Sequence, residues 1–278
     1  MATDPSLPVI AGFWTQAELS WLEQLSIRSF LDAGHRYVLY SYHEIAGVPE
    51  GVEQRDARSI LSASGGLIDR RRAVFHADHF RLSLLRKTRF VWADLDMVCI
   101  RPLMPHDGYL LGFIKEQRVG NSVMALPSES PALAQMLSFV TAQNPIPPWV
   151  KGDKRAAFEA RIAAGERWDI TALPWGMAGP KALTYFLAQS GETPHVSAQP
   201  TYYPVGQGTM QHLLDPSQGT RIAFPQTKAV HVFGYNRQVM ADLHHGLPPA
   251  GSWLDLACQK HGIVPQGALI TPLKDDLA

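Results

Sequence analysis

The sequence predicts an α/β fold, because short apolar runs alternate with segments of helical periodicity along most of the chain. Hydrophobic residues make up 46% of the chain and charged residues 18%, a balance that allows a buried core under a modestly charged surface. Its 278 residues have the length of one large domain. We therefore expect a single domain over residues 1–278.

The first strand is expected at residues 8–14, where an apolar run ends in an aromatic residue. Thr15 and Glu18 then form the pattern Thr-x-x-Glu, which is typical of the capping box at a helix N-terminus. Gly34 stands where such a helix would end in a left-handed glycine. Residues 36–42 are rich in β-branched and aromatic side chains and predict a second strand, so the chain begins as a doubly wound sheet does.

The rest of the chain continues the alternation of strands and helices. A helical period covers residues 74–86, and a short apolar strand follows at 90–93. The later elements, in chain order, are strands at 109–114 and 121–126, a helix at 131–142, a linker-like stretch at 144–148, helices at 151–164 and 180–189, a strand at 229–233 and a helix at 253–260.

The charge balance excludes one class of partner. The chain has 25 Lys and Arg against 25 Asp and Glu, so its formal net charge is zero, and nucleic-acid binding depends on an excess of basic residues. The N-terminus lacks the cationic and apolar regions of a secretory signal, and no uncharged run is apolar enough to span a membrane. Cys99 and Cys258 are too few for a disulfide framework. We expect a cytoplasmic protein without a nucleic-acid partner or membrane span; peripheral membrane contact and the oligomeric state stay open.

Asp94 and Asp96 flank Leu95 at the end of an apolar strand, which is where open α/β sheets bind ligands. Alternation in an extended strand would turn both carboxylates to one face and Leu95 to the core. Fifteen Asp in this chain produce roughly one Asp-x-Asp triplet by chance, and such a triplet can also be a polar turn. Apolar residues on both sides, however, make two charges costly unless a cation or basic groups compensate them. Carboxylate oxygens suit Mg²⁺ or Mn²⁺.

Asp78 and Arg81 lie three residues apart on the preceding helix and so share a face. Taken alone, such a pair is a local ion pair that contributes a few tenths of a kcal/mol, about the value of an exposed helix pair. Placed one helix before Asp94 and Asp96, it is also a candidate part of the same site.

These residues together resemble a known family. Asp78-x-x-Arg81, the strand that carries Asp94-Leu95-Asp96, and Ile100-x-Pro102-Leu103 are similar to the sugar-binding region of DXD-containing retaining glycosyltransferases. That group includes α-1,4-galactosyl- and N-acetylglucosaminyltransferases, yeast-type α-mannosyltransferases and, more distantly, the glucosylating domains of large clostridial toxins. The resemblance covers most of the chain; its other segments include Phe13-Trp14, Gly34-His35, Tyr40-Ser41-Tyr42, Trp175-Gly176-Met177, Gly179-Pro180 and His231-Val232-Phe233.

The resemblance implies a GT-A-like fold, a nucleotide-binding mixed sheet flanked by helices. It also implies a metal-dependent hexosyltransferase that moves a sugar from a nucleotide-diphospho-sugar, preferably a UDP-sugar, to a glycan or glycolipid acceptor with retention of configuration, in polysaccharide biosynthesis. Mn²⁺ or Mg²⁺ would stabilise the charge that grows on the leaving diphosphate. Residues 1–105 would bind the donor and the metal, and residues 106–278 would face the acceptor.

The resemblance carries roles to particular residues. Asp96 would be a direct metal ligand, and Asp94 would bridge the metal and the ribose. Asp78 would accept a hydrogen bond from sugar hydroxyls, while Arg81 orients it and approaches the diphosphate. These four are the predicted catalytic residues.

Further candidates lie outside this core. His231 ends an expected strand and is either a third metal ligand or a buried structural histidine. Trp14 and, more weakly, Tyr42 are candidates for stacking on the donor base, and both could instead be core aromatics. The remaining expectations are Leu95 in the donor site and Asp169 and Gly179 on the acceptor side.

One segment departs from the family pattern. The family has a glycine pair immediately before its DXD strand, whereas this chain has Lys87-Thr88-Arg89. The turn must then be built without glycine's freedom, and we expect it to bring two cations near the site.

Two alternatives remain. A hydrophobic strand followed by Asp-x-Asp-x-Val also resembles the first motif of haloacid-dehalogenase-like phosphatases, whose first Asp is a nucleophile. That enzyme class needs a second acidic group, for which Asp153 and the pair Asp275-Asp276 are the candidates here. The other alternative is a non-catalytic, transferase-like carbohydrate-binding protein, against which the joint presence of Asp78, Arg81 and the two DXD carboxylates argues.

Overall fold

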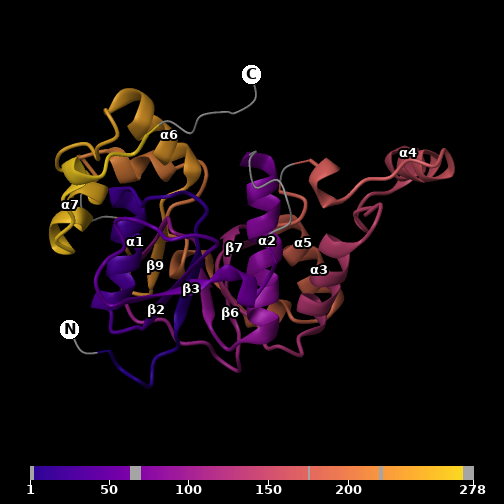
Figure 1. Ribbon diagram of the computed structural model, residues 1–278, viewed down its shortest axis with the longest axis horizontal. Coiled ribbons are helices and arrows are strands. Elements are labelled where there is room, and N and C mark those ends of the chain that lie inside the picture. Colours follow the sequence, from indigo (N-terminus) through magenta and orange to yellow (C-terminus); the bar gives the residue numbers. More distant parts are fainter. Residues whose placement is uncertain (1–2, 63–69, 175, 219–221, 272–278) are drawn as a thin grey trace.

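The computed structural model describes residues 3–62, 70–174, 176–218 and 222–271. Within them the main element is a seven-stranded sheet in the order β3-β2-β1-β4-β7-β6-β8 (Figure 1). β7 runs antiparallel to β4 and β6, and the other pairs are parallel. The strands are β1 Ile10–Phe13, β2 Tyr37–Ser41, β3 Val52–Asp56, β4 Val91–Ala93, β6 Leu110–Lys115, β7 Arg118–Ala125 and β8 Val196–Ser197. The predicted α/β fold with a mixed sheet flanked by helices is confirmed.

Helices cover both faces of this sheet. Along β1 and β2 successive residues alternate between two apolar clusters, so that Ala11 and Val38 face one layer while Ile10 and Leu39 face the other. The first layer contains α2, α3 and α5, and the second contains α1. The helices are α1 Trp21–Asp32, α2 Arg70–Lys87, α3 Pro131–Thr141, α4 Gly152–Ala163, α5 Pro180–Gln189, α6 Gly234–Leu243 and α7 Trp253–Lys260.

A second, two-stranded sheet joins distant parts of the chain. β5 (Met97–Cys99) pairs antiparallel with β9 (Ala229–His231), and Met97 lies opposite His231. Apolar residues of α1, α6 and α7 pack together beside it in a third cluster. This pairing brings the chain after residue 228 back to the end of β4.

The first helix begins later than the sequence predicts. Its N-cap is Ser20, and Glu23 completes the capping box, so Thr15 and Glu18 lie before the helix and the prediction for them is wrong. Two Ser/Thr-x-x-Glu patterns follow each other here. The second one caps the helix, because a helix that begins after Ser20 buries Trp21 and the next apolar residues fully. Gly34 does follow the helix end, with φ of 93°.

β7 starts at Arg118 rather than at the predicted residue 121. A two-residue turn precedes it, in which Gln117 has φ of 54°. Gly120 lies within β7, and glycine is needed there because the ring of Tyr203 packs against the backbone. A Cβ at this position would be 2.4 Å from the Tyr203 hydroxyl oxygen. That hydroxyl in turn accepts hydrogen bonds from the backbone N–H groups of Ser122 and Val123.

The predicted linker at 144–148 is the base of an arm, residues 144–168, which carries α4. Asn144 and Trp168 are joined by two hydrogen bonds, a backbone N–H of Asn144 to the Trp168 carbonyl at 2.9 Å and a backbone N–H of Trp168 to the Asn144 side chain at 2.8 Å. α4 lies between them, contains no buried residue and stands away from the other helices (Figure 1).

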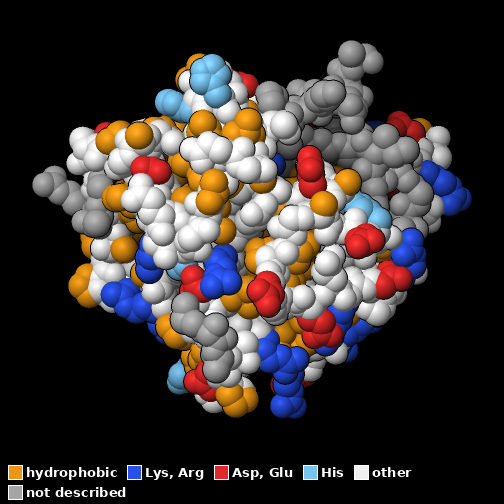
Figure 2. Space-filling model, turned by 60° about the vertical axis from the view of Figure 1, so that its left-hand side comes forward, with side chains coloured by type: hydrophobic (Ala, Val, Ile, Leu, Met, Phe, Trp, Pro, Cys, Tyr) orange, Lys and Arg blue, Asp and Glu red, His pale blue; other side chains and the backbone are white. Residues whose placement is uncertain are grey.

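Charged side chains of both signs lie among apolar ones over the face in Figure 2. Among the described residues, no helix has the length and hydropathy needed to cross a membrane.

Candidate active site

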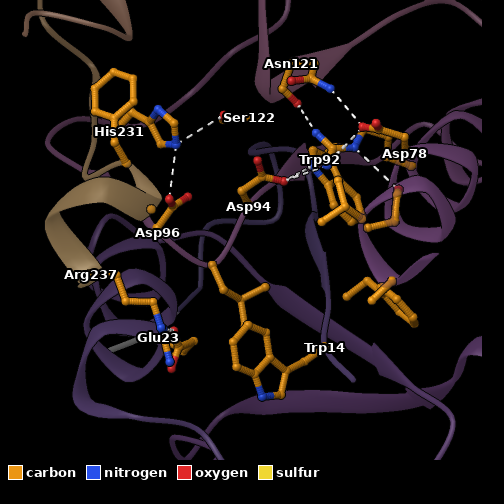
Figure 3. A pocket seen from close by; sticks show the side chains of 18 of the residues that line it. Trp14, Glu23, Asp78, Trp92, Asp94, Asp96, Asn121, Ser122, His231 and Arg237 are labelled. Carbon is orange, nitrogen blue, oxygen red and sulfur yellow. Dashed lines mark hydrogen bonds and ion pairs between the residues drawn. The ribbon is translucent and has the colours of Figure 1, made fainter. Parts of the chain in front are cut away.

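A cavity of about 510 Å³ lies at the carboxyl ends of β1 and β4, the edge at which the sequence predicts a ligand site (Figure 3). Its size is in the range of small-molecule sites. Its polar lining includes Trp14, Glu23, Asp78, Arg81, Trp92, Asp94, Asp96, Asn121, Ser122, Gln207, His231 and Arg237.

The two DXD carboxylates lie in a turn, not in an extended strand. β4 ends at Ala93, and the backbone N–H of Met97 donates to the carbonyl of Asp94 at 3.0 Å as the chain turns into β5. The expectation that strand alternation aligns the carboxylates is therefore wrong. Asp94, Leu95 and Asp96 nevertheless all line the cavity, because this tight turn stands at its wall.

Two serines of α1 fix this turn from behind. The Ser26 hydroxyl donates to the carbonyl of Met97 at 2.7 Å, and the Ser29 hydroxyl accepts the backbone N–H of Cys99 at 2.8 Å. These bonds pair buried backbone groups just beyond the carboxylates and so hold the turn in one conformation.

Arg81 contacts both Asp78 of α2 and Asp94 of the DXD turn. Its Nη2 lies 3.2 Å from Oδ1 of Asp94 and 3.5 Å from Oδ1 of Asp78, and its Nη1 donates to the backbone carbonyl of Asn121 at 2.6 Å. Asn121 in turn donates from Nδ2 to Asp78 at 3.0 Å. The guanidinium also packs over the ring of Trp92, whose Nε1 donates to Asp94 Oδ1 at 2.8 Å. The pair Asp78 and Arg81 is thus part of the cavity network and more than a surface ion pair.

His231 reaches the cavity from the end of β9, as the sequence predicts. Its Nε2 lies 3.1 Å from Oδ2 of Asp96 and 3.3 Å from the hydroxyl of Ser122. Its Nδ1 is buried and has no hydrogen-bond partner among the described residues. Phe233 packs on the imidazole at 4.1 Å and has φ of 66°, a backbone strain of the kind that clusters at functional sites.

The donor set fits a hard divalent cation. Ligand atoms of Asp94, Asp96 and His231 lie within 4.8 Å of one another. Asp96 and His231 form an ion pair of 3.1 Å, and a cation held by these two side chains would replace this contact. Carboxylate oxygens with one imidazole are donors that Mg²⁺ or Mn²⁺ accepts.

Burial and neighbouring charges shift the pKa values in this cavity. Burial raises the pKa of Asp78 to about 6 and raises that of Asp94 as well, although Arg81 opposes both shifts. Burial also acts to raise the pKa of Asp96, but the neighbouring His231 lowers it on balance. The pKa of His231 is raised because the charge of Asp96 outweighs the effect of burial. A cation at His231 must therefore displace a proton.

A second ion pair lies at the other wall of the cavity. Glu23 is 1% exposed; its Oε2 accepts from the backbone N–H and hydroxyl of Ser20, and its Oε1 accepts from Nη1 of Arg237. The Arg237 guanidinium lies 5.8 Å from the ring centre of Trp14. Trp14 is half-buried and lines the cavity, a position that leaves its predicted stacking role open.

Three predicted residues do not line the cavity. Tyr42 lies in a separate hollow behind Phe13, and its hydroxyl is bonded to Leu61 and His76. Asp169 caps the 3₁₀ helix η2 (Ile170–Ala172) and is exposed. Gly179 lies instead behind Asp78, because a Cβ there would be 3.4 Å from Asp78 Oδ2. Trp175, part of the Gly-Pro segment, lies outside the described residues.

The cations of Lys87-Thr88-Arg89 are not near the site, so that expectation is wrong. The segment precedes β4, whereas Asp94 follows it, and Nζ of Lys87 donates to the carbonyl of Ile60 at 2.7 Å. Thr88 builds the turn without glycine: its hydroxyl donates to the Leu84 carbonyl and accepts the N–H of Phe90.

Sequence reasoning missed several cavity residues. Trp92 could have been found from the sequence, because it lies two residues before Asp94 on the same strand and lines the same cavity. Glu23 had a sequence signal in the Ser-x-x-Glu pattern of its helix. Asn121, Ser122 and Arg237 had none, because they come from β7 and α6, far along the chain.

The raised pKa of Asp78 predicts a pH-dependent cost. Because its folded-state pKa of about 6 lies above the ordinary value of 3.8, the folded state binds this proton more tightly, and stability falls as pH rises from 4 to 6. Asp78→Asn removes this titration. We expect the unfolding free energy of the variant, relative to wild type, to rise by about 2–3 kcal/mol between pH 4 and pH 7. Urea unfolding in EDTA measures this difference; a difference that is flat with pH would contradict it.

No protein-family model matches the chain, and no curated protein matches it significantly. Among solved structures, the chain is similar to the apo structure of the WbbM bifunctional glycosyltransferase, with a TM-score of 0.40 and 11% sequence identity. The similarity covers 94% of this chain and 53% of the WbbM chain, so this chain spans about half the length of that protein.

Proposed function

We propose that this protein is a metal-dependent glycosyltransferase that moves a sugar from a nucleotide-diphospho-sugar to a glycan or glycolipid acceptor. The observation that carries the proposal is that Asp94, Asp96 and His231 bring three metal-ligand atoms together in the cavity that also holds the linked pair Asp78 and Arg81. The resemblance to DXD-containing transferases joins the same residues in the sequence.

Several residues of the cavity suit such a transfer. A divalent cation, when bound, supplies Lewis-acid stabilisation of the leaving diphosphate. Arg237, whose guanidinium is paired with Glu23, lines the same cavity and could donate N–H groups to that diphosphate. Asp78 is held through Oδ1 by Asn121 and Arg81, and this orientation suits it to accept a hydrogen bond from a sugar hydroxyl. Trp14 offers an aromatic face to the donor base.

The details of the proposed reaction follow the resemblance to DXD-containing transferases. We propose a UDP-sugar donor, hexosyl transfer with retention of configuration, and Mn²⁺ or Mg²⁺ as the cation. We also propose a place in cytoplasmic polysaccharide biosynthesis. The acidic residues described in the cavity are Glu23, Asp78, Asp94 and Asp96, and each already has a basic or hydrogen-bonding partner.

The phosphatase alternative receives less support. Its nucleophile would be Asp94, whose Oδ1 is engaged by Trp92 and Arg81. Its second acidic group would be Asp153, which is exposed on α4 and does not line the cavity, or Asp275-Asp276, which lie outside the described residues.

The direct test is donor hydrolysis, which needs no acceptor. Wild-type protein is incubated with UDP-glucose, UDP-galactose, UDP-N-acetylglucosamine and GDP-mannose, each with Mn²⁺ or with EDTA, and release of UDP or GDP is measured. We expect release from one of these donors in Mn²⁺ and at least a tenfold lower rate in EDTA, because the cation stabilises the leaving group. Release of inorganic phosphate from a phosphomonoester instead, or equal rates with and without Mn²⁺, would contradict the proposal.

A further inference from the structure

Glu23 has two partners on opposite sides of its carboxylate. As the third residue of α1 it completes the capping box, with Oε2 accepting from the Ser20 backbone N–H at 2.8 Å and from its hydroxyl at 2.6 Å. Oε1 receives Nη1 of Arg237 from α6. The Glu23 side chain is 2% exposed and that of Arg237 is 12% exposed, so this ion pair is largely withdrawn from water.

Arg237 and Asp96 line the same cavity but do not form an ion pair. No nitrogen of Arg237 lies within 4.0 Å of an Asp96 oxygen, and the guanidinium pairs with Glu23 instead. Nε of Arg237 is buried and has no hydrogen-bond partner among the described residues. Figure 3 shows Arg237 beside Glu23, on the side of Asp96 away from His231.

A guanidinium and a carboxylate that line one cavity can pair when the arginine side chain turns toward the carboxylate. Arg binds carboxylates with two parallel N–H donors, and a buried donor without a partner is costly. Such a pair would occupy the Asp96 oxygens and remove the negative charge that a cation needs. Here the guanidinium pairs with Glu23 instead, whose other carboxylate oxygen is held by Ser20.

We infer that Glu23 is a positioning residue that holds Arg237 away from Asp96 and so keeps the Asp96 carboxylate available for a divalent cation. The inference rests on the proposed metal site at Asp94, Asp96 and His231. It assigns to the first turn of α1 control over metal affinity, although Glu23 itself is no metal ligand. The ligand concerned is a hard divalent cation, probed below as Mn²⁺ alone.

The experiment removes the charge of Glu23 without removing the helix cap. Gln also completes a capping box, so Glu23→Gln preserves the start of α1. The dissociation constant for Mn²⁺ is measured from the electron paramagnetic resonance signal of the free ion. We expect Glu23→Gln to weaken Mn²⁺ binding by at least tenfold, since Arg237 then turns to Asp96. The double variant Glu23→Gln with Arg237→Gln should bind Mn²⁺ within about threefold of Arg237→Gln alone.

A matched control removes a charge from the same helix outside the cavity. Asp32 pairs with Arg28 and His261 at the other end of α1, and Asp32→Asn should leave Mn²⁺ affinity unchanged. If Glu23→Gln fails to fold, Glu23→Asp, which keeps the charge but shortens its reach, should weaken Mn²⁺ binding by a smaller factor. Circular dichroism verifies the fold of each variant.

The outcomes separate this inference from the proposed function. Wild-type protein that binds no Mn²⁺ overturns both. Wild-type binding with unchanged affinity in Glu23→Gln overturns only the role of Glu23. Weakened binding that the Arg237→Gln change does not restore also overturns it, because Glu23 would then act only by supporting the fold.

Discussion

Asp96→Asn is expected to lower metal-dependent donor hydrolysis by about a thousandfold, equivalent to about 4 kcal/mol of transition-state stabilisation. The substitution keeps the shape of the side chain but removes the negative charge of the carboxylate, whose Oδ2 atom lies 3.1 Å from Nε2 of His231. Asn is a weaker ligand for a hard cation, and the raised pKa that Asp96 imposes on His231 should also be lost. Rates of UDP or GDP release at saturating donor and Mn²⁺ measure the effect.

The control for Asp96 is an aspartate on the arm. Asp153 is exposed on α4 and does not line the cavity, so Asp153→Asn should leave the rate within about twofold of wild type. The melting temperature without metal should change little in Asp153→Asn but fall in Asp96→Asn, because that variant removes the ion-pair partner of the buried His231. A rate for Asp96→Asn within tenfold of wild type would remove Asp96 from the role of metal ligand.

Arg81→Met is expected to destabilise the fold by about 3–5 kcal/mol, the usual effect of leaving a buried charge unpaired. Arg81 is the shared partner of Asp78 and Asp94, and it also supports the Asn121 carbonyl. Methionine replaces its packing on Trp92 but none of its charge. This loss is a large fraction of the stability of a typical domain. Urea unfolding at pH 7 in EDTA measures it.

Two further variants show whether charge is the cause. Arg86→Met, on the same helix, changes an exposed residue that donates to the Ser128 carbonyl, and we expect an effect below about 1 kcal/mol. Adding Asp78→Asn to Arg81→Met should recover part of the lost stability, because one of the two unpaired carboxylates is then neutral. If Arg81→Met costs less than 1 kcal/mol, the buried network does not depend on this arginine.

The parts of the site that the sequence could predict are those set by local rules. Asp94 and Asp96 follow an apolar strand, and Asp78 and Arg81 share one face of a single helix turn; both facts are visible over short stretches. His231 was a candidate because it lies in a short apolar strand, expected at 229–233 and observed as β9 Ala229–His231. The helix and strand pattern of the central sheet was accessible for the same reason, since strands buried on both faces read as apolar runs.

What the sequence could not predict depends on tertiary packing. The edge strand β3 has the sequence Val-Glu-Gln-Arg-Asp and is largely exposed, so it lacks a hydrophobic pattern. From the sequence Gly120 resembles a turn residue, but in the structure the ring of Tyr203 occupies the space that a side chain at this position would need. The contact of Glu23 with Arg237 joins residues 214 positions apart, and no local periodicity encodes it.

The pairing of β5 with β9 gives the proposed cation a mechanical role. Asp96 and His231 are neighbours in space but lie 135 positions apart in the chain, so an ion that binds both closes a very long loop. A covalent cross-link over about 100 residues restrains the unfolded chain by about 4–5 kcal/mol, and reversible coordinate bonds supply a part of this. Chelation would then first loosen the segment that carries α6 and α7, which makes it the earliest target of limited proteolysis. An ion bound at this site would thus also link the segment after residue 228 to the turn that follows β4.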